Sequence, residues 1–286
     1  MQTRQEKNKK IVSDIKKEKN IKRSKKMLVF LLIISIILIL VYLYMYFIGT
    51  SFIQTHEYVI KNNNIPSSFH GTKIVHLSDL LYGTTIDKND LDYLKKEISK
   101  INPDIIVFTG DLVYDKYQLT NNDLDILKDF FNNLDYRIGK FAVKGDMDST
   151  TFDLVMEESK FQVLDNNYEI IYNNDNTPII ISGININNSN LFNINNSNNN
   201  YLISLIHNYD HYNNYNINAN LVLAGHNLGG EIRLPFLGAM LGENKYVDNY
   251  YEENSNIVHI SNGLGSYHKM RLFNHPSINV YRLYNN

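Results

Sequence analysis

The feature that most constrains this chain is the run from Met27 to Ile48, twenty-two residues without a charge. As a helix it would be about 33 Å long, enough to cross the hydrocarbon layer of a bilayer. Tyr42, Tyr44 and Tyr46 lie near its far end, where interfacial aromatic residues are typical. A cleaved signal peptide is the alternative, but the run is too long and no small-x-small cleavage site follows it. We therefore predict an uncleaved transmembrane anchor over residues 27–48.

Charge is distributed unevenly on the two sides of this run. Residues 1–26 carry eleven Lys or Arg against three acids, a net +8, whereas the whole chain has net charge -2. By the positive-inside rule, residues 1–26 are predicted to form a mobile or weakly helical cytoplasmic tail. The chain would then be a single-pass membrane protein whose main domain is extracytoplasmic. A basic tail can also bind nucleic acid, but we expect none here, because a membrane-length run follows it directly.

The rest of the chain alternates predicted strands and helices, which indicates an α/β domain. We predict a juxtamembrane linker and entry strand over residues 49–72 and one large domain over 73–286. The predicted strands are 73–77, 105–108, 141–143, 169–172, 178–182, 201–206, 221–224, 257–261 and 278–283, and the predicted helices are 88–101, 123–134 and 151–158.

Five of these strands are followed by a residue that can bind a metal ion. Aspartates follow the first three at Asp79, Asp111 and Asp146, and histidines follow two later strands at His207 and His226. Ligands bind at the carboxyl ends of strands in open α/β sheets, so these side chains are expected to converge there. Since the chain has no cysteine, any metal must bind His, Asp, Glu or Asn. The alternative is a plain scaffold, in which each carboxylate only caps a helix or faces solvent.

The order of these residues resembles that of the calcineurin-like metallophosphoesterases, in particular their membrane-anchored or exported bacterial branch. That family shows the blocks D-x-H, G-D, G-N-H-D/E, a lone His after a strand, and G-H-x-H. This chain offers Asp79-Leu80-Leu81, Gly110-Asp111, Gly145-Asp146-Met147-Asp148, His207, and Gly225-His226-Asn227-Leu228-Gly229-Gly230-Glu231, with a closing segment at 261–265 and 270–273. The resemblance covers about residues 58 to 286 and implies a four-layer αββα sandwich.

The resemblance also assigns site residues, and three of them are lost. Asp111 would bridge two metals, and Asp146, His207 and His226 would hold one of them. The other metal would take Asp79 and two histidines, but these histidine positions are Leu81 and Leu228, and the phosphate-contacting histidine falls on Met147. We therefore expect one divalent ion, Mn²⁺ or Mg²⁺ by preference, with iron and zinc as alternatives.

Two main hypotheses follow for function. The first is a membrane-anchored phosphoesterase that hydrolyses a phosphomonoester, phosphodiester or pyrophosphate, including lipid-linked ones, with Asp148, His211 or Tyr82 as candidate leaving-group acids. The second is an inactive relative that binds a phosphate-containing ligand or a protein partner. The apolar stretch 234–241 is either a lip that meets the bilayer or ordinary core.

Overall fold

The computed structural model describes residues 4–188, 193–194, 196, 198–215, 217–240, 245–253 and 256–286. It divides into two compact units, Met1–Met45 and Tyr46–Asn286. In the first unit, helix α1 (Arg4–Leu43) runs through the basic tail and into the uncharged run. A π-helical turn, η1 (Tyr44–Ile48), follows it and includes the first three residues of the second unit. By length and composition this helix can cross a membrane.

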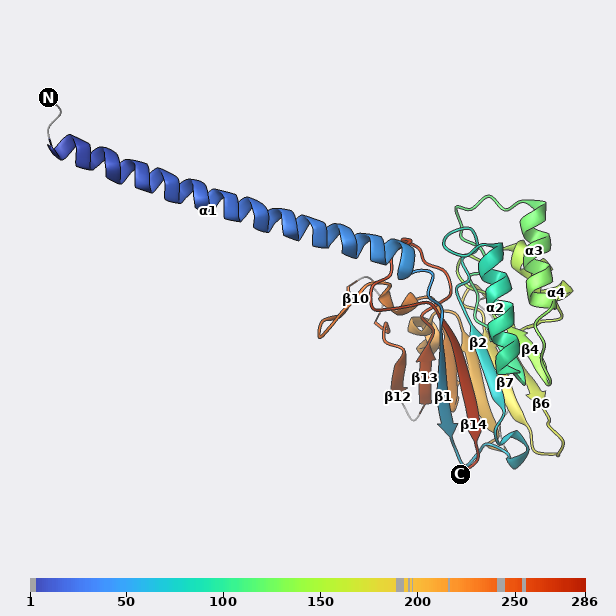
Figure 1. The fold of residues 1–286 in the computed structure, drawn as a ribbon. Helices are drawn as coiled ribbons and strands as arrows, with labels where there is room; N and C mark the ends of the chain where they lie inside the picture. The colour runs from blue at the N-terminus through green and yellow to red at the C-terminus, as the bar shows by residue number, and fades with distance from the viewer. Residues whose placement is uncertain are drawn as a thin grey trace. The chain divides into compact units, whose positions relative to one another are not determined.

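The second unit contains two mixed six-stranded sheets (Figure 1). The first has the order β1-β14-β2-β3-β4-β5 and the second β12-β13-β9-β8-β7-β6. The strands of the first sheet are β1 (Gln54–Lys61), β2 (Lys73–Leu77), β3 (Ile105–Phe108), β4 (Gly139–Ala142), β5 (Gln162–Val163) and β14 (Ser277–Tyr284). Those of the second are β6 (Asn167–Ile171), β7 (Ile179–Ile184), β8 (Tyr201–Ile206), β9 (Leu221–Ala224), β12 (Tyr250–Glu253) and β13 (Asn256–Ile260).

Alternate residues of each strand point to opposite faces of its sheet, so each sheet has an inner face and an outer face. The inner faces of the two sheets pack against each other. In β3, Ile105 and Val107 lie in the core between the sheets, and Ile106 and Phe108 lie in the core under the helices. That outer layer consists of α2 (Lys88–Ile101), α3 (Asn121–Asn132) and α4 (Thr150–Glu158). The four-layer prediction is thus confirmed.

The fourth layer differs in kind from an ordinary αββα sandwich. The outer face of the second sheet is covered by the 3₁₀-helix η3 (Tyr209–Asn214) and by neighbouring loops. Tyr209, Tyr212 and Tyr246 pack there against Val222 and Val258. Two shorter 3₁₀ turns, η2 (Ser67–Phe69) and η4 (Leu228–Gly230), lie in connecting segments.

Local sequence signals explain why the predicted elements form where they do. Strands β2, β3, β8 and β9 and helix α2 have the predicted bounds, and the others differ by a few residues at their ends. Asp87 caps α2 and Thr120 caps α3, each in a capping box with the aspartate three residues later. Asp111 therefore does not cap the helix that follows it, because Thr120 has that role.

Candidate metal centre

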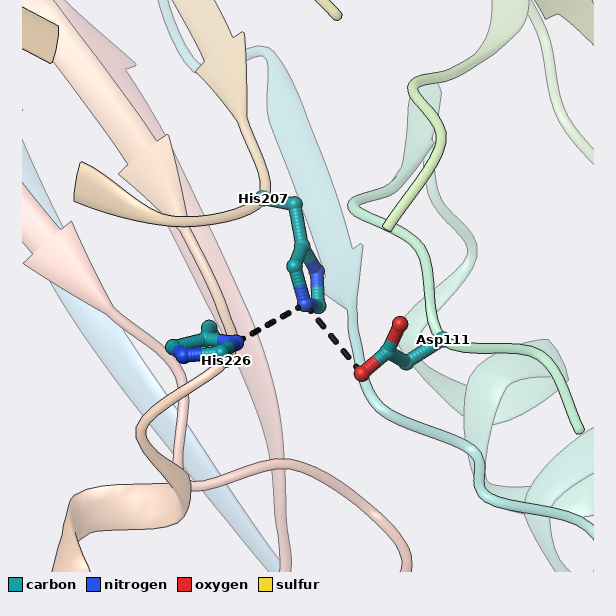
Figure 2. Close-up of side chains that lie close together, drawn as sticks. All are labelled: Asp111, His207 and His226. Carbon is teal, nitrogen blue, oxygen red and sulfur yellow. Dashed lines mark hydrogen bonds and ion pairs between the residues drawn. The ribbon is translucent and has the colours of Figure 1, made fainter. Parts of the chain in front are cut away.

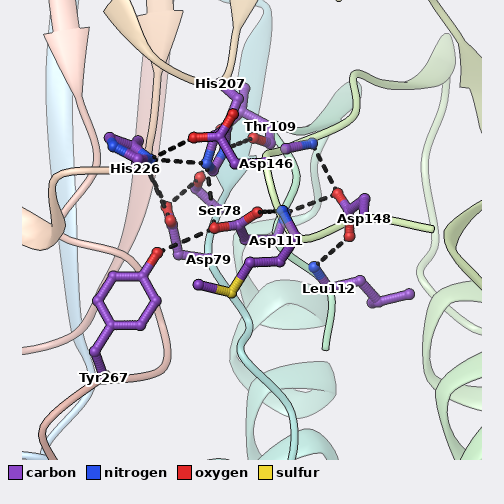
Figure 3. A network of polar contacts seen from close by, with 12 residues as sticks. Ser78, Asp79, Thr109, Asp111, Leu112, Asp146, Asp148, His207, His226 and Tyr267 are labelled. Carbon is purple, nitrogen blue, oxygen red and sulfur yellow. Dashed lines mark hydrogen bonds and ion pairs between the residues drawn. The ribbon is translucent and has the colours of Figure 1, made fainter. Parts of the chain in front are cut away.

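Residues that follow five strands meet between the carboxyl ends of β2, β3 and β4 and those of β8 and β9 (Figure 3). Two glycines allow the connecting loops to approach closely. A Cβ on Gly110, whose φ is 91°, would lie 2.2 Å from the backbone nitrogen of Gly145. A Cβ on Gly225 would lie 1.9 Å from Ser78 Oγ. Any larger residue at these two positions would separate the loops that carry the site.

The site loops also hold left-handed backbone at residues that rarely adopt it. The φ angles are 50° at Asp79, 56° at Asp111 and 70° at His226. Leu81 and Leu228 have φ of 46° and 47°. Each such conformation costs on the order of 1–3 kcal/mol and persists where the surroundings enforce it, commonly at functional sites.

Three side chains present metal-binding atoms to one another (Figure 2). His207 Nε2 lies 3.2 Å from Asp111 Oδ2 and 3.3 Å from His226 Nδ1. Asp146 adds a fourth donor, since its Oδ2 lies 3.1 Å from His226 Nδ1. Asp111 and His207 are fully buried, whereas the side chains of His226 and Asp146 are 23% and 35% exposed. Two of the four side chains are thus buried in the core, and the other two are partly accessible to solvent.

Hydrogen bonds behind these residues fix their orientation. His207 Nδ1 donates to the carbonyl oxygen of Thr109 at 2.6 Å, which turns Nε2 toward Asp111. The Thr109 hydroxyl donates to Ser78 Oγ, and Ser78 donates to Asp79 Oδ2 at 2.5 Å. His76 Nε2 donates to the Thr109 hydroxyl at 2.8 Å, because that hydroxyl already uses its own proton.

The charges at the site depend on one another. Burial opposes the charge of the Asp111 carboxylate, but His207 and hydrogen bonds outweigh it and lower the pKa of Asp111 to about 2. Burial likewise opposes the charge of His207, yet the nearby carboxylates, Asp111 first, raise the pKa of His207 well above its usual value. His207 therefore carries the proton that balances the carboxylates. A divalent cation would displace that proton and balance the same charges, so the donor set fits such an ion.

The opposite side of Asp111 has a different composition. We call Asp146, His207 and His226 the histidine side, and Asp79, Leu81 and Leu228 the leucine side. Both leucines are buried, with 0% and 1% exposure. The Asp79 carboxylate accepts the backbone N–H of His226, at 3.1 Å from each oxygen. Burial raises the pKa of Asp79 to about 6. The leucine side thus offers one carboxylate, which already supports the backbone of the histidine side.

Sequence reasoning missed Tyr267, whose hydroxyl donates to Asp111 Oδ2 at 3.0 Å (Figure 3). The same oxygen faces His207. Tyr267 follows the closing turn, in which the backbone nitrogens of Leu264 and Gly265 donate to the carbonyl oxygens of Ser78 and Asp79. The glycine turn at 263–265 was the available signal, because it marks a close approach to the first aspartate loop.

The candidate leaving-group acids lie in other environments. Asp148 Oδ2 accepts the backbone N–H groups of Asp111 and Gly145, and Oδ1 accepts that of Leu112, each at 2.8 Å. Burial, with Asp111 adding, raises the pKa of Asp148 to about 6. The hydrogen bonds of the Asp148 carboxylate therefore hold the Asp111 loop in place.

The other two candidates are not brought to the metal-binding atoms. His211 is exposed on η3. The Tyr82 hydroxyl donates to Asp123 Oδ1 at 3.1 Å. The backbone nitrogen of Met147 donates to Asp111 Oδ1 at 2.9 Å.

Comparison with known proteins gives consistent matches. A family model described as calcineurin-like phosphoesterase matches residues 72–261. The uncharacterized metallophosphoesterase YkuE of Bacillus subtilis is 29% identical over 248 residues, which are 81% of this chain and 85% of that protein. The UDP-2,3-diacylglucosamine pyrophosphatase LpxG of Chlamydia trachomatis is 36% identical over 94 residues, 32% of this chain and 28% of LpxG. A transmembrane protein with metallophosphoesterase domain from Danio rerio is 27% identical over 100 residues, 35% of this chain and 21% of that protein.

Proposed function

The chain belongs to the calcineurin-like phosphoesterase family, and on this premise we propose that it is a membrane-anchored phosphoesterase that uses one divalent metal ion. The observation that carries the proposal is the convergence of Asp111 Oδ2, His207 Nε2 and His226 Nδ1, all within 4.8 Å of one another. Asp146 Oδ2 lies beside them. A plain scaffold does not account for this convergence, because Asp111 and His207 are buried and face each other rather than solvent.

The histidine side and Asp111 would hold the ion through two oxygens and two nitrogens. Carboxylates suit Mg²⁺ and Mn²⁺, whereas imidazoles suit iron and zinc, so this mixed set favours Mn²⁺ over Mg²⁺. When bound, such an ion polarises a phosphoryl oxygen and lowers the pKa of a coordinated water. The chain's own residues supply the rest: Thr109 orients His207, Asp148 holds the Asp111 loop, and Tyr267 holds the Asp111 carboxylate.

The substrate class is a phosphate ester or pyrophosphate, including lipid-linked ones. A cavity of about 260 Å³ lies next to the Asp111 loop, lined by Tyr114, Met147, Asp148 and Ser149 but by none of the four proposed metal-binding residues. The similarity to LpxG, which is named a UDP-2,3-diacylglucosamine pyrophosphatase, supports a lipid-linked substrate. The charge asymmetry supports a cytoplasmic tail and an extracytoplasmic domain.

A second candidate function is a relative that binds a phosphate-containing ligand or a protein partner without hydrolysing it. The observation that favours it is the apolar leucine side, where Leu81 and Leu228 are buried at the positions to which the family resemblance assigns two metal-binding histidines. Neither side chain can bind a metal, and Met147 cannot give the hydrogen bond of the third lost histidine.

Hydrolysis by the full chain in detergent with Mn²⁺ separates the two candidates. Phosphomonoester, phosphodiester and UDP-diacylglucosamine substrates would be compared for wild type, Asp111→Ala and the Leu81→His/Met147→His/Leu228→His variant. The phosphoesterase proposal predicts metal-dependent turnover in wild type and none in Asp111→Ala. Turnover in the triple-histidine variant alone, with Mn²⁺ bound to both proteins, would favour the non-catalytic relative.

A further inference from the structure

Strands β10 (Arg233–Leu234) and β11 (Gly238–Ala239) form a hairpin that projects from the two sheets (Figure 1). Its tip carries exposed apolar side chains. Phe236 is fully exposed, Leu237 is 73% exposed, and Met240, just after β11, is 52% exposed. These values exclude the ordinary-core interpretation for the described part of 234–241, and Leu241 lies outside the described residues. Adjacent exposed Phe and Leu side chains at a protruding tip mark an interaction site.

Two more exposed aromatic residues lie on segments joined to this hairpin. The backbone nitrogen of Arg233 donates to the carbonyl oxygen of Leu272 at 2.9 Å, and Phe273, the next residue, is 62% exposed. Phe52 is 58% exposed, and its ring contacts His275 with centroids 5.3 Å apart. We call Phe52, Phe236, Leu237, Met240 and Phe273 the apolar rim. It is built on three neighbouring segments.

The apolar rim is continuous with the end of the uncharged run. Residues 46–48 belong to the same compact unit as the sheets, and Phe47 and Ile48 are 62% and 54% exposed. The backbone nitrogen of Phe52 donates to the carbonyl oxygen of Ile48 at 3.2 Å. The segment that carries Phe52 thus begins where the membrane-length run ends. Between Ile232 and Met240 the only charge is Arg233, which is paired with Asp248.

The base of the hairpin is also hydrogen-bonded to a loop that contacts the metal centre. Glu231, two residues before β10, accepts hydrogen bonds from Ser266 Oγ at 2.5 Å and from the ring of His268. Between these two residues lies Tyr267, which contacts Asp111. One loop therefore joins the base of the hairpin to the site.

We propose that the β10–β11 hairpin inserts its apolar tip into the lipid bilayer and that the apolar rim is a membrane-docking surface. Insertion would bury Phe236 and Leu237 at the boundary of head groups and acyl chains. It would also hold the metal centre at the level of lipid head groups. The inference rests on the membrane anchoring in the proposed function, but on neither metal binding nor hydrolysis.

Tryptophan fluorescence tests this directly, because the chain contains no tryptophan. Phe236→Trp places one indole at the hairpin tip, and a substitution there leaves the core intact because the side chain is fully exposed. The matched control is Tyr172→Trp, since Tyr172 is 58% exposed next to β6, the far edge strand of the second sheet. Both full-length variants would be reconstituted in phosphatidylcholine–phosphatidylglycerol vesicles with and without acyl-brominated phosphatidylcholine. Flotation would report anchoring separately.

With both variants floating, the proposal predicts that Phe236→Trp emission shifts to shorter wavelength and is lost in brominated vesicles, while Tyr172→Trp keeps its emission. Water-like, unquenched emission from Phe236→Trp in floating vesicles would overturn the docking surface and leave the anchor standing. If Phe236→Trp emission shifted to shorter wavelength but were not quenched by bromine, the indole would be buried against protein, such as a second copy, rather than lipid. That result would also overturn the docking surface. Failure of either variant to float would contradict the anchoring itself, and the docking surface with it.

Discussion

The two sides of Asp111 share a backbone design but differ in chemistry. On the histidine side, His226 holds a left-handed φ and offers a ring nitrogen to His207 and Asp146. On the leucine side, Leu81 and Leu228 hold φ angles of 46° and 47° but offer only buried methyl groups. Left-handed backbone is therefore present on both sides, whereas the candidate metal-binding atoms gather on the histidine side.

Packing supports the loops on the leucine side. A Cβ on Gly263 would lie 2.3 Å from Leu228 Cδ2 and 3.0 Å from Asp79 Cβ, so these side chains are tightly packed against the closing turn. Asp79 links the sides by accepting the backbone N–H of His226. A strained backbone persists here where neighbouring loops determine it.

The largest effect is expected from Asp111→Ala, which removes the residue that both sides share. His207 would lose its main carboxylate partner, and the ion would lose a buried anionic oxygen. We expect Mn²⁺ affinity to fall by more than about 100-fold, beyond the usual effect of losing a supporting residue. Calorimetric titration of the full chain measures this. Asp115→Ala, four residues on and exposed, is the matched control and should bind as wild type does. Equal Mn²⁺ affinity in wild type, Asp111→Ala and Asp115→Ala would show that Asp111 does not bind the ion.

Leu81→His with Leu228→His should abolish the difference between the two sides. Histidine is close to leucine in volume and adds a ring nitrogen at each position, so the double variant is expected to bind a second equivalent of Mn²⁺. Elemental analysis after desalting would count the ions, and each single variant is a control that should retain one. If the double variant folds normally and still binds one ion, the two added histidine ligands are not sufficient to create a second metal site on the leucine side.

Proton competition should distinguish the histidine side from an oxygen-only site. The pKa of His207 is raised, so the ring is protonated at neutral pH and must lose a proton when metal binds. Asp111 and Asp146 have lowered pKa values and are already ionised, so neither adds such competition. Mn²⁺ affinity should therefore rise about tenfold per pH unit between about pH 6 and about pH 7. Titration in buffers of different ionisation enthalpy would count the released proton, and a pH-independent affinity would refute the role of His207.

The smallest effect is expected from Tyr267→Phe, which keeps the ring and removes the hydroxyl that donates to Asp111 Oδ2. Supporting hydrogen bonds of this kind change metal affinity by about tenfold or more, so we expect roughly tenfold weaker Mn²⁺ binding with unchanged stoichiometry. Tyr114→Phe, on the Asp111 loop, is the control. If Tyr267→Phe bound Mn²⁺ as tightly as wild type, the hydroxyl would have no part in holding Asp111 for the ion.

Much of the fold was predictable from sequence because its signals are local. Continuous apolar runs predicted β3, β8 and β9, and spacing of Leu91, Leu94 and Ile98 predicted α2. The convergence of Asp111, His207 and His226 followed from the rule on strand ends. Tyr267 did not follow, because its contact depends on how the closing turn docks on the first aspartate loop. The structural role of Asp148 was hidden for the same reason, since two of its three backbone N–H partners, Asp111 and Leu112, belong to another loop.

We propose that this chain binds one divalent ion, on the histidine side of Asp111. Native mass spectrometry of the full chain released from detergent, after loading with Mn²⁺ and desalting, tests it most directly because it needs no substrate. We expect one Mn²⁺ per wild-type chain and none in Asp111→Ala. Two ions per wild-type chain, or an equal count in both proteins, would contradict it.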